Sequence, residues 1–230
     1  MIRICLVLLV FSNMLSAQKW SVEPMLGTRF DWNNLREVQG DIQHEPHGLF
    51  SFGVEVNRHP HPKLHQGIGF SRHGFGNSYI VEGELTNPLR LGGMNQFYSA
   101  VSFHHTYQFL KIERYEFEGG IGGQLFFTKG LSEQPGGLAN NRSVGIEERH
   151  SGKAGVSPVG FVRANIRYRQ KPTSNFTSFM RVELNVGTRA LYETNVSYRT
   201  SDNEEGSGVV KNRATGFLMA FGLRYEFINF

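Results

Sequence analysis

Hydrophobic and polar residues alternate with a period of two along most of the chain. In the first such stretch Val22, Leu26 and Phe30 lie on one face, while Glu23 and Arg29 lie on the other. This period is the signature of a strand with unlike faces, and no stretch keeps the period of a helix. The pattern predicts strands at about residues 20–32, 48–57, 64–73, 96–110, 115–127, 155–169, 176–191 and 216–227.

The connections between these predicted strands alternate in length. The short ones are 58–63, 111–114 and 170–175, and the long polar ones are 33–47, 74–95, 129–153 and 193–213. Short turns at one end and long loops at the other are typical of outer-membrane barrels. The sequence therefore predicts an all-β fold, an eight-stranded antiparallel up-and-down transmembrane β-barrel. Residues 78–87 also alternate, which predicts a hairpin that continues beyond the membrane.

Two barrels compatible with this pattern differ in which face is inside. A soluble barrel of lipocalin type is apolar inside, whereas a membrane barrel is apolar outside. Aromatic residues gather near the ends of the apolar faces, as interfacial girdles do, which favours the membrane barrel. These aromatic residues are Trp20, Phe30, Trp32, Phe97, Tyr107, Phe109, Tyr115 and Phe127.

The polar faces would then line a lumen with almost balanced charge. Its expected members are Glu23, Arg29, Asp31, Glu55, Glu116, Glu118, Arg163, Arg167, Arg181, Glu183, Arg189, Arg224 and Glu226. Because an eight-stranded barrel is just wide enough for side chains to fill it, we expect a plugged lumen. Glu116 or Glu118 should pair there with Arg163 or Arg167.

The first 17 residues have the features of a secretory signal peptide, with cleavage expected after Ala17. Arg3 precedes an apolar run from Ile4 to Phe11, and a small-residue stretch follows. Cys5 is the sole cysteine, so the exported chain, residues 18–230, forms no disulfide. These features predict a bacterial envelope protein.

Composition excludes several other classes of protein. The chain has 230 residues, of which 39% are hydrophobic and 19% charged, and it contains 27 glycines. These shares rule out a coiled coil or helical bundle. Beyond residue 17 no apolar run approaches the roughly 20 residues of a membrane-spanning helix. The net charge of +4 is scattered, without the basic stripe of a nucleic-acid-binding protein.

Two segments resemble a known family. The run from Ala220 to Phe227, AFGLRYEF, resembles the C-terminal signal by which the barrel-assembly machinery recognises its clients. Residues 97–127 are similar to the fourth and fifth strands of the Bacteroidota outer-membrane barrel family, also described as PorT-like or porin-like. The resemblance implies outer-membrane residence and little about activity.

A lipid hydrolase at the membrane rim would need a His with a nearby hydroxyl nucleophile. His104 and His105, with Ser102 and Thr106, are the candidates, but no acid accompanies them in their strand. We therefore expect no catalytic residues, with His104 in a luminal hydrogen-bond network. His105 should face lipid toward the periplasmic side.

Metal and cofactor sites are also not expected. His59, His61 and His65, with His44 and His47, could suggest a metal site, but a solvated turn is the better interpretation. Asp202, Glu204 and Glu205 fit a solvated loop tip better than a calcium site. No helix follows Gly119-Gly120-Ile121-Gly122-Gly123, so this run should accommodate bulky luminal neighbours or a bend rather than a phosphate.

The sequence thus predicts a non-enzymatic outer-membrane barrel that acts through its extracellular loops. Expected partners are outer-membrane lipids, the barrel-assembly machinery and another envelope protein, without nucleic acid. An accessory barrel of a secretion or envelope-assembly complex and a rim-site lipid A hydrolase remain the alternatives.

Overall fold

The computed structural model describes residues 19–32, 35–45, 47–81, 89–92, 96–141, 144–171, 173–200 and 203–227. The predicted signal peptide, Asp202 and the last three residues lie outside these ranges. No helix in the described part of the chain is long and apolar enough to cross a membrane.

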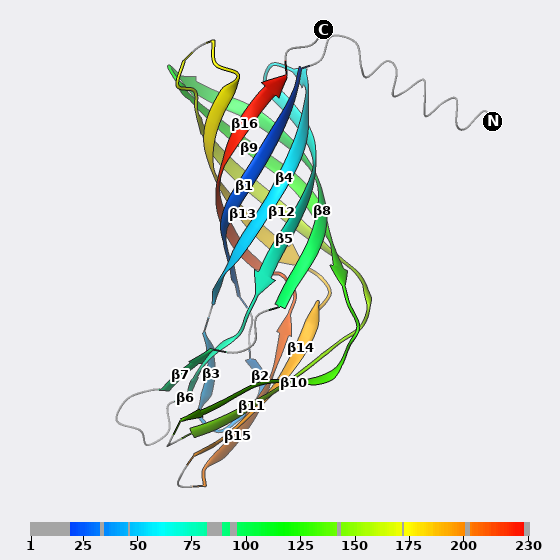
Figure 1. The fold of residues 1–230 in the computed structure, drawn as a ribbon, viewed down its shortest axis with the longest axis vertical. Coiled ribbons are helices and arrows are strands. Elements are labelled where there is room, and N and C mark those ends of the chain that lie inside the picture. Colours follow the sequence, from blue (N-terminus) through cyan, green and yellow to red (C-terminus); the bar gives the residue numbers. More distant parts are fainter. Residues whose placement is uncertain are drawn as a thin grey trace, which may run out of the picture.

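Eight antiparallel strands close into a barrel, and each pairs with its neighbours in chain order (Figure 1). The ring closes where β1 pairs with β16, Trp20 lying opposite Phe227. The up-and-down barrel predicted from the alternating pattern is thereby confirmed. Its strands are β1 (Lys19–Asp31), β4 (Gly48–His61), β5 (Leu64–Phe75), β8 (Gln96–Ile112), β9 (Tyr115–Thr128), β12 (Gly155–Tyr168), β13 (Phe176–Gly187) and β16 (Gly216–Phe227).

The two ends of the barrel differ, as the connection lengths predict. At one end, which we call the turn end, short turns join β4 to β5, β8 to β9 and β12 to β13. The described chain also begins and ends there, at the top of Figure 1. At the opposite end, which we call the sheet end, the four long connections emerge together.

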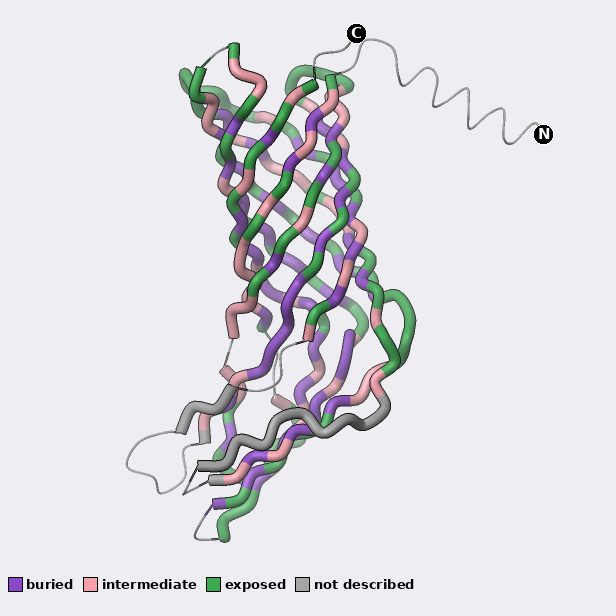
Figure 2. The backbone as a smooth tube through the Cα atoms, in the orientation of Figure 1, coloured by how far each residue is buried: buried purple, intermediate pink, exposed green. Residues whose placement is uncertain are grey.

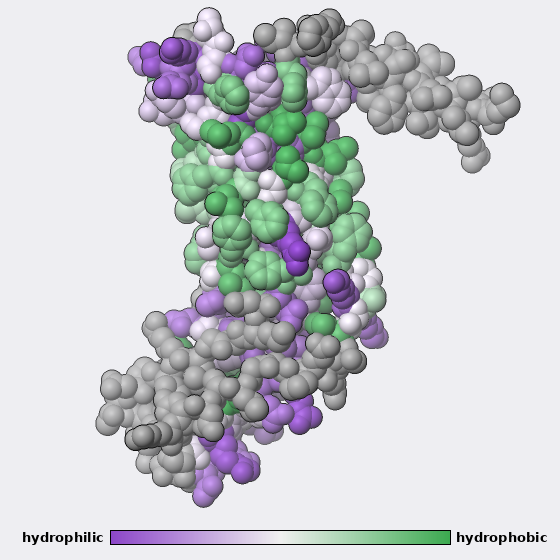
Figure 3. All heavy atoms as spheres, viewed as in Figure 1, coloured by the Kyte–Doolittle hydropathy of each residue, from purple (hydrophilic) through white to green (hydrophobic). Residues whose placement is uncertain are grey.

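Along each barrel strand, outward apolar residues alternate with inward polar residues (Figure 2). Side chains such as Ile121 and Phe109 expose 63% and 62% of their surface on the outer wall, whereas Glu23 and Arg29 inside expose none. Apolar side chains cover the wall between more polar ends (Figure 3). The membrane-type orientation of the faces is the one observed.

The predicted lumen membership needs one correction. Arg189 was expected on the polar face of a strand reaching residue 191, but β13 ends at Gly187 and Arg189 is exposed beyond it. Charged side chains are not confined to the lumen, because Arg72 of β5 faces outward with its guanidinium 5.8 Å from the centre of the Phe97 ring.

The long connections are not irregular loops, which corrects the prediction from sequence. They form a five-stranded sheet in the order β10-β11-β14-β15-β2 and a three-stranded sheet in the order β3-β6-β7. The predicted hairpin near residues 78–87 is present in part, as β6 pairs with β7, and residues 82–88 lie outside the described ranges. These strands are β2 (Leu35–Gln39), β3 (Ile42–Glu45), β6 (Ser78–Val81), β7 (Leu89–Gly92), β10 (Leu131–Asn141), β11 (Val144–Gly152), β14 (Tyr192–Thr200) and β15 (Glu205–Asn212).

The two sheets share a small apolar core. It consists of Ile42, Tyr79, Ile146, Val196, Tyr198 and Val210, with Leu35 packed against them. The opposite face of the five-stranded sheet is polar and carries exposed ion pairs, such as Arg149 with Glu147 at 2.9 Å. The sheet end is therefore a folded unit with one water-facing surface.

Candidate functional site

The barrel interior is filled by a connected group of buried ion pairs. Arg163 contacts both Glu55 (3.0 Å) and Glu183 (2.9 Å). Arg167 contacts Glu118 at 2.7 Å and Glu23 at 2.9 Å. A charge in a dry interior is tolerated only when it is paired and hydrogen-bonded, and each of these side chains has an opposite charge within reach.

Strand register explains why these pairs form. Glu23 of β1 lies directly opposite Glu55 of β4, a like-charge pair that would be unfavourable alone. Arg181 of β13 reaches across the lumen and contacts Glu23 at 3.1 Å and Glu55 at 2.9 Å. The guanidinium thus offsets the repulsion between the two carboxylates and joins β13 to β1 and β4, strands that it does not pair with in the sheet.

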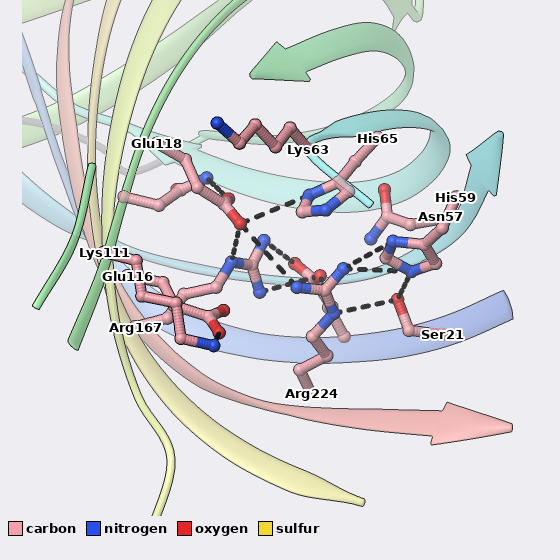
Figure 4. A network of polar contacts seen from close by, with 12 residues as sticks. Ser21, Asn57, His59, Lys63, His65, Lys111, Glu116, Glu118, Arg167 and Arg224 are labelled. Carbon is pink, nitrogen blue, oxygen red and sulfur yellow. Dashed lines mark hydrogen bonds and ion pairs between the residues drawn. The ribbon is translucent and has the colours of Figure 1, made fainter. Parts of the chain in front are cut away.

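Toward the turn end the network, whose polar contacts Figure 4 shows, borders a cavity of about 480 Å³. Nη2 of Arg224 lies 2.9 Å from both ring nitrogens of His59, and Nδ1 of His65 lies 3.2 Å from a carboxylate oxygen of Glu118. The cavity is mainly cationic, with Lys19, Lys63, Lys111, Arg169 and Arg224 against Glu116 and Glu226. Its chemistry suits an acidic group that approaches from this end.

The histidines proposed as metal ligands are divided between the two ends of the molecule. His59 and His65 meet at the turn end, with ring centres 4.4 Å apart, whereas His44 lies in β3 of the sheet end. His59 is not a solvated turn residue, as the sequence suggested, because it lies in β4 and its Nε2 is 3.0 Å from Oγ of Ser21. Within the described residues no three metal-ligating side chains form a group.

His104 lies in the lumen, as predicted. Its Nε2 is 2.9 Å from Oδ1 of Asn57 and 3.7 Å from Glu55, an acid partner on β4 that its own strand does not supply. His105 faces outward, so the two histidines lie on opposite sides of the wall. The candidate hydroxyls Ser102 and Thr106 are buried on the luminal face with His104 and do not reach the outer wall.

The glycine run in β9 makes room for luminal side chains. A Cβ atom on Gly122 would lie 2.3 Å from the Phe161 ring, and one on Gly120 would lie 2.8 Å from Oγ1 of Thr106. The expectation that small residues here accommodate bulky neighbours is confirmed.

At the sheet end an apolar cluster lies beside the buried ion pair of Arg29 with Asp31 (2.9 Å), a feature that was not predicted from the sequence. Phe75, Tyr98 and Phe126 converge there from three neighbouring strands and pack with Tyr192. The Arg29 guanidinium lies 4.9 Å from the centre of the Phe75 ring. Each of the three barrel aromatics occupies a polar-face position near the sheet end of the barrel, and this shared position is the signal that could have revealed the cluster.

Beyond this cluster a buried polar row crosses the two outer sheets. Oγ1 of Thr194 lies 2.8 Å from Nδ1 of His150 and accepts a hydrogen bond from Asn77 at 3.1 Å. Burial lowers the pKa of His150 below its usual value, against the opposing effect of Glu148, 3.6 Å from its Nε2. Burial, with Glu148 adding to it, raises the pKa of Tyr79. The row has the residue types of a hydrolytic triad, but its members are buried from solvent.

Comparison with known proteins identifies the fold and not the activity. No protein-family model and no curated protein sequence matches the chain. The crystal structure of the outer membrane protein OprG from Pseudomonas aeruginosa is similar, with a TM-score of 0.54, 13% identity and coverage of 92% of this chain and 96% of that one. A major outer membrane protein from Thermus thermophilus matches at a TM-score of 0.47, with 12% identity over 92% of this chain and 100% of that one. The outer membrane protease OmpT from Escherichia coli matches at 0.41, with 14% identity over 92% and 97%. The likeness to OprG supports an outer-membrane type of barrel, and a shared fold alone assigns no activity.

Proposed function

We propose that the protein is a non-enzymatic outer-membrane β-barrel with a closed lumen that presents its folded sheet end as an interaction surface. The turn end would face the periplasm and the sheet end would face the exterior. The observation that carries this proposal is the inverted arrangement of faces, with apolar side chains outside and ion pairs inside.

The outer wall has the physical properties that a bilayer requires. A closed barrel leaves no unpaired strand edge, and its outward apolar band can contact lipid tails. Aromatic residues at the two ends of the wall, such as Phe109 toward the turn end and Trp32 at the sheet end, fit the interfacial regions. Outer-membrane lipids are therefore the first partners we infer.

The last strand supports recognition by the barrel-assembly machinery. In β16 the side chains of Phe221, Leu223 and Phe227 are exposed on the outer wall, whereas Arg224 faces the lumen. This is the alternation of the family signal. It supports assembly as a bacterial outer-membrane barrel, and membership of the Bacteroidota family stays a proposal carried by the sequence.

The alternatives differ in how well the described residues fit them. A rim hydrolase would need His104 or His105 beside a nucleophile at the outer wall, but His104 contacts Asn57 inside the lumen. An accessory role in secretion or envelope assembly is favoured by the cationic cavity at the turn end, which could receive an acidic segment of a periplasmic partner.

Membrane residence can be tested on the folded protein. We expect the full chain to fractionate with outer membranes and, in detergent, to migrate differently on a gel before and after boiling. In intact cells, an epitope inserted at residues 201–202, between β14 and β15, should be accessible to antibody, whereas one at residues 113–114 should not. Recovery as a detergent-independent soluble monomer would refute the proposal, and reversed epitope accessibility would refute the orientation.

A further inference from the structure

Four cations lie at the rim of the barrel at its sheet end, next to four of its strands. Arg213 precedes β16, Arg189 follows β13, Lys153 precedes β12 and Lys129 follows β9. These four strands are consecutive neighbours in the barrel. On the other side, the described residues directly adjoining β1, β4 and β5 at this end are Trp32, His47 and Gly76. The cation Arg72 of β5 lies there on the outer wall, over the ring of Phe97.

Three of these cations line one open cavity of about 640 Å³ between the barrel and the five-stranded sheet. Arg189, Arg213 and Lys153 are exposed, and no carboxylate pairs with any of them among the described residues. The cavity's acid, Glu193, already has a partner in Lys211 at 3.2 Å. The cavity is therefore left with an excess of positive charge.

Hydrogen bonds and close packing hold the backbone segments that carry these cations. Oγ1 of Thr128 donates to the carbonyl of Lys153 at 2.9 Å, and Oγ of Ser157 donates to the carbonyl of Arg189 at 3.0 Å. The guanidinium of Arg189 lies over Gly155, where a Cβ atom would be 3.7 Å from it.

Arg213 is held in the same way by its close neighbours. Gly187 packs so tightly against the backbone of Arg213 that a Cβ atom there would overlap the Arg213 carbonyl group. A backbone hydrogen bond of 2.7 Å joins Leu191 to Asn212, the residue before Arg213. Cations on such anchored segments can meet a multiply charged anion without much loss of chain entropy.

The height of the cavity on the barrel indicates which anion it meets. Outward Phe127 and Val186 are exposed on the apolar wall, and Lys129 and Arg189 follow them by two and three residues. At about 3.3 Å per residue on tilted strands, this places the cations in the headgroup layer just beyond the apolar band. Leu131 and Leu191 give the cavity an apolar side as well.

We propose that this cavity binds the phosphate-bearing headgroup of a glycolipid in the outer leaflet. The inference rests on the proposed outer-membrane residence and orientation. Arg189 and Arg213 would contact phosphate oxygens through their guanidinium groups, with Lys153 adding charge. The bound lipid would anchor one face of the barrel in the outer leaflet. This is the face formed by β9, β12, β13 and β16.

The test uses the purified full-length exported chain, folded in an uncharged detergent, and measures lipid binding by native mass spectrometry. The probes are bis-phosphorylated lipid A, enzymatically dephosphorylated lipid A and inorganic phosphate. We expect binding of the phosphorylated lipid alone at micromolar concentration. Replacing Lys153, Arg189 and Arg213 with Ala should weaken it by about fivefold for each residue and by the order of 100-fold together.

A matched variant controls for overall charge. Arg36→Ala, Arg114→Ala and Lys171→Ala remove three exposed cations that line neither the turn-end cavity nor this one, and they should leave lipid A binding unchanged. The inference would be overturned if phosphorylated and dephosphorylated lipid A bound equally well. It would also be overturned if both triple variants lost the same share of lipid A binding, or if inorganic phosphate bound and the lipid did not displace it. Each variant is checked for its heat-dependent gel shift, so loss of the fold is distinguished from loss of the site. A wild-type barrel that shows this shift but binds no lipid A refutes the inference while leaving the proposed function intact.

Discussion

Arg181 and Glu55 show how single residues hold the lumen together. Arg181 contacts carboxylates on two strands that do not pair with its own, and Glu55 receives contacts from both Arg181 and Arg163. All of these side chains are almost completely buried. Because desolvation of each charge is costly, the network is favourable only while every member keeps its partners.

Removing one charge from this network should therefore destabilise the barrel. Glu55→Gln keeps the size of the side chain but leaves Arg163 and Arg181 with one carboxylate fewer. We expect the free energy of unfolding to fall by about 3–5 kcal/mol. The measurement is urea unfolding of the barrel in lipid vesicles, followed by tryptophan fluorescence.

The control is Glu147→Gln, which removes an exposed partner of Arg149 on the outer sheet. An exposed ion pair contributes only about 0–1 kcal/mol to the free energy of unfolding. The urea midpoint of this variant should therefore stay near that of the parent protein. Equal midpoints for both variants would show that the luminal pairs contribute no more than surface pairs.

The sequence predicted which charges are luminal better than it predicted their partners. Glu118 with Arg167 was among the expected pairs and is present. The contact of Arg163 with Glu55 could not be foreseen, because β12 and β4 are not neighbours in the ring. Contacts across a lumen depend on the stagger and tilt of the strands, which alternation along one strand does not specify.

At the scale of elements, the outer strands were harder to recognise than the barrel strands. In β14, Tyr192, Thr194 and Val196 alternate with exposed polar residues, so a strand signal was present there. In contrast, β10 contains Pro135 and several small or polar residues, and β2 is short. Such strands form because neighbouring chains supply hydrogen-bond partners, and local sequence alone does not reveal this.

The pairing of the outer strands predicts what a loop exchange would do. Replacing residues 129–153 with a short Gly-Ser turn removes β10 and β11 but leaves every barrel strand in place. We expect the barrel to keep its heat-dependent gel shift, because β9 and β12 still pair. The remaining β14–β15 hairpin should become sensitive to protease, since β14 loses its pairing with β11.

The same variant tests the interaction surface through affinity purification from gently solubilised membranes. Envelope proteins that bind the sheet end should be lost from the variant, whereas a Gly-Ser replacement of residues 170–175 at the turn end should retain them. Loss of these proteins only with the turn-end replacement would favour the accessory role at the periplasmic side. A loop variant that no longer folds would contradict the independence of the barrel from its outer sheets.

At the scale of the whole molecule, the lumen is closed by two different kinds of packing. The middle and turn end contain the ion pairs of Glu23, Glu55 and their arginines. The sheet end contains aromatic side chains, with Phe75 and Phe126 completely buried around the guanidinium of Arg29, which pairs with Asp31 at 2.9 Å. An ion that crossed the barrel would have to break paired charges and then pass an apolar barrier, both at a high free-energy cost.

The closed lumen leads to a prediction about conductance. Pure protein reconstituted into planar lipid bilayers should show no stable channel steps, because two barriers in series block the path.

Phe126→Ala shortens one side chain of the aromatic cluster but leaves the contacts of Arg163 with Glu55 and Glu183 intact, so this variant should also remain closed. An open porin inserted into the same bilayer establishes that single channels are detectable. Regular conductance steps from the parent protein would contradict the closed lumen. Steps from Phe126→Ala alone would show that the aromatic cluster is the principal barrier and that ions can pass the region of the luminal ion pairs.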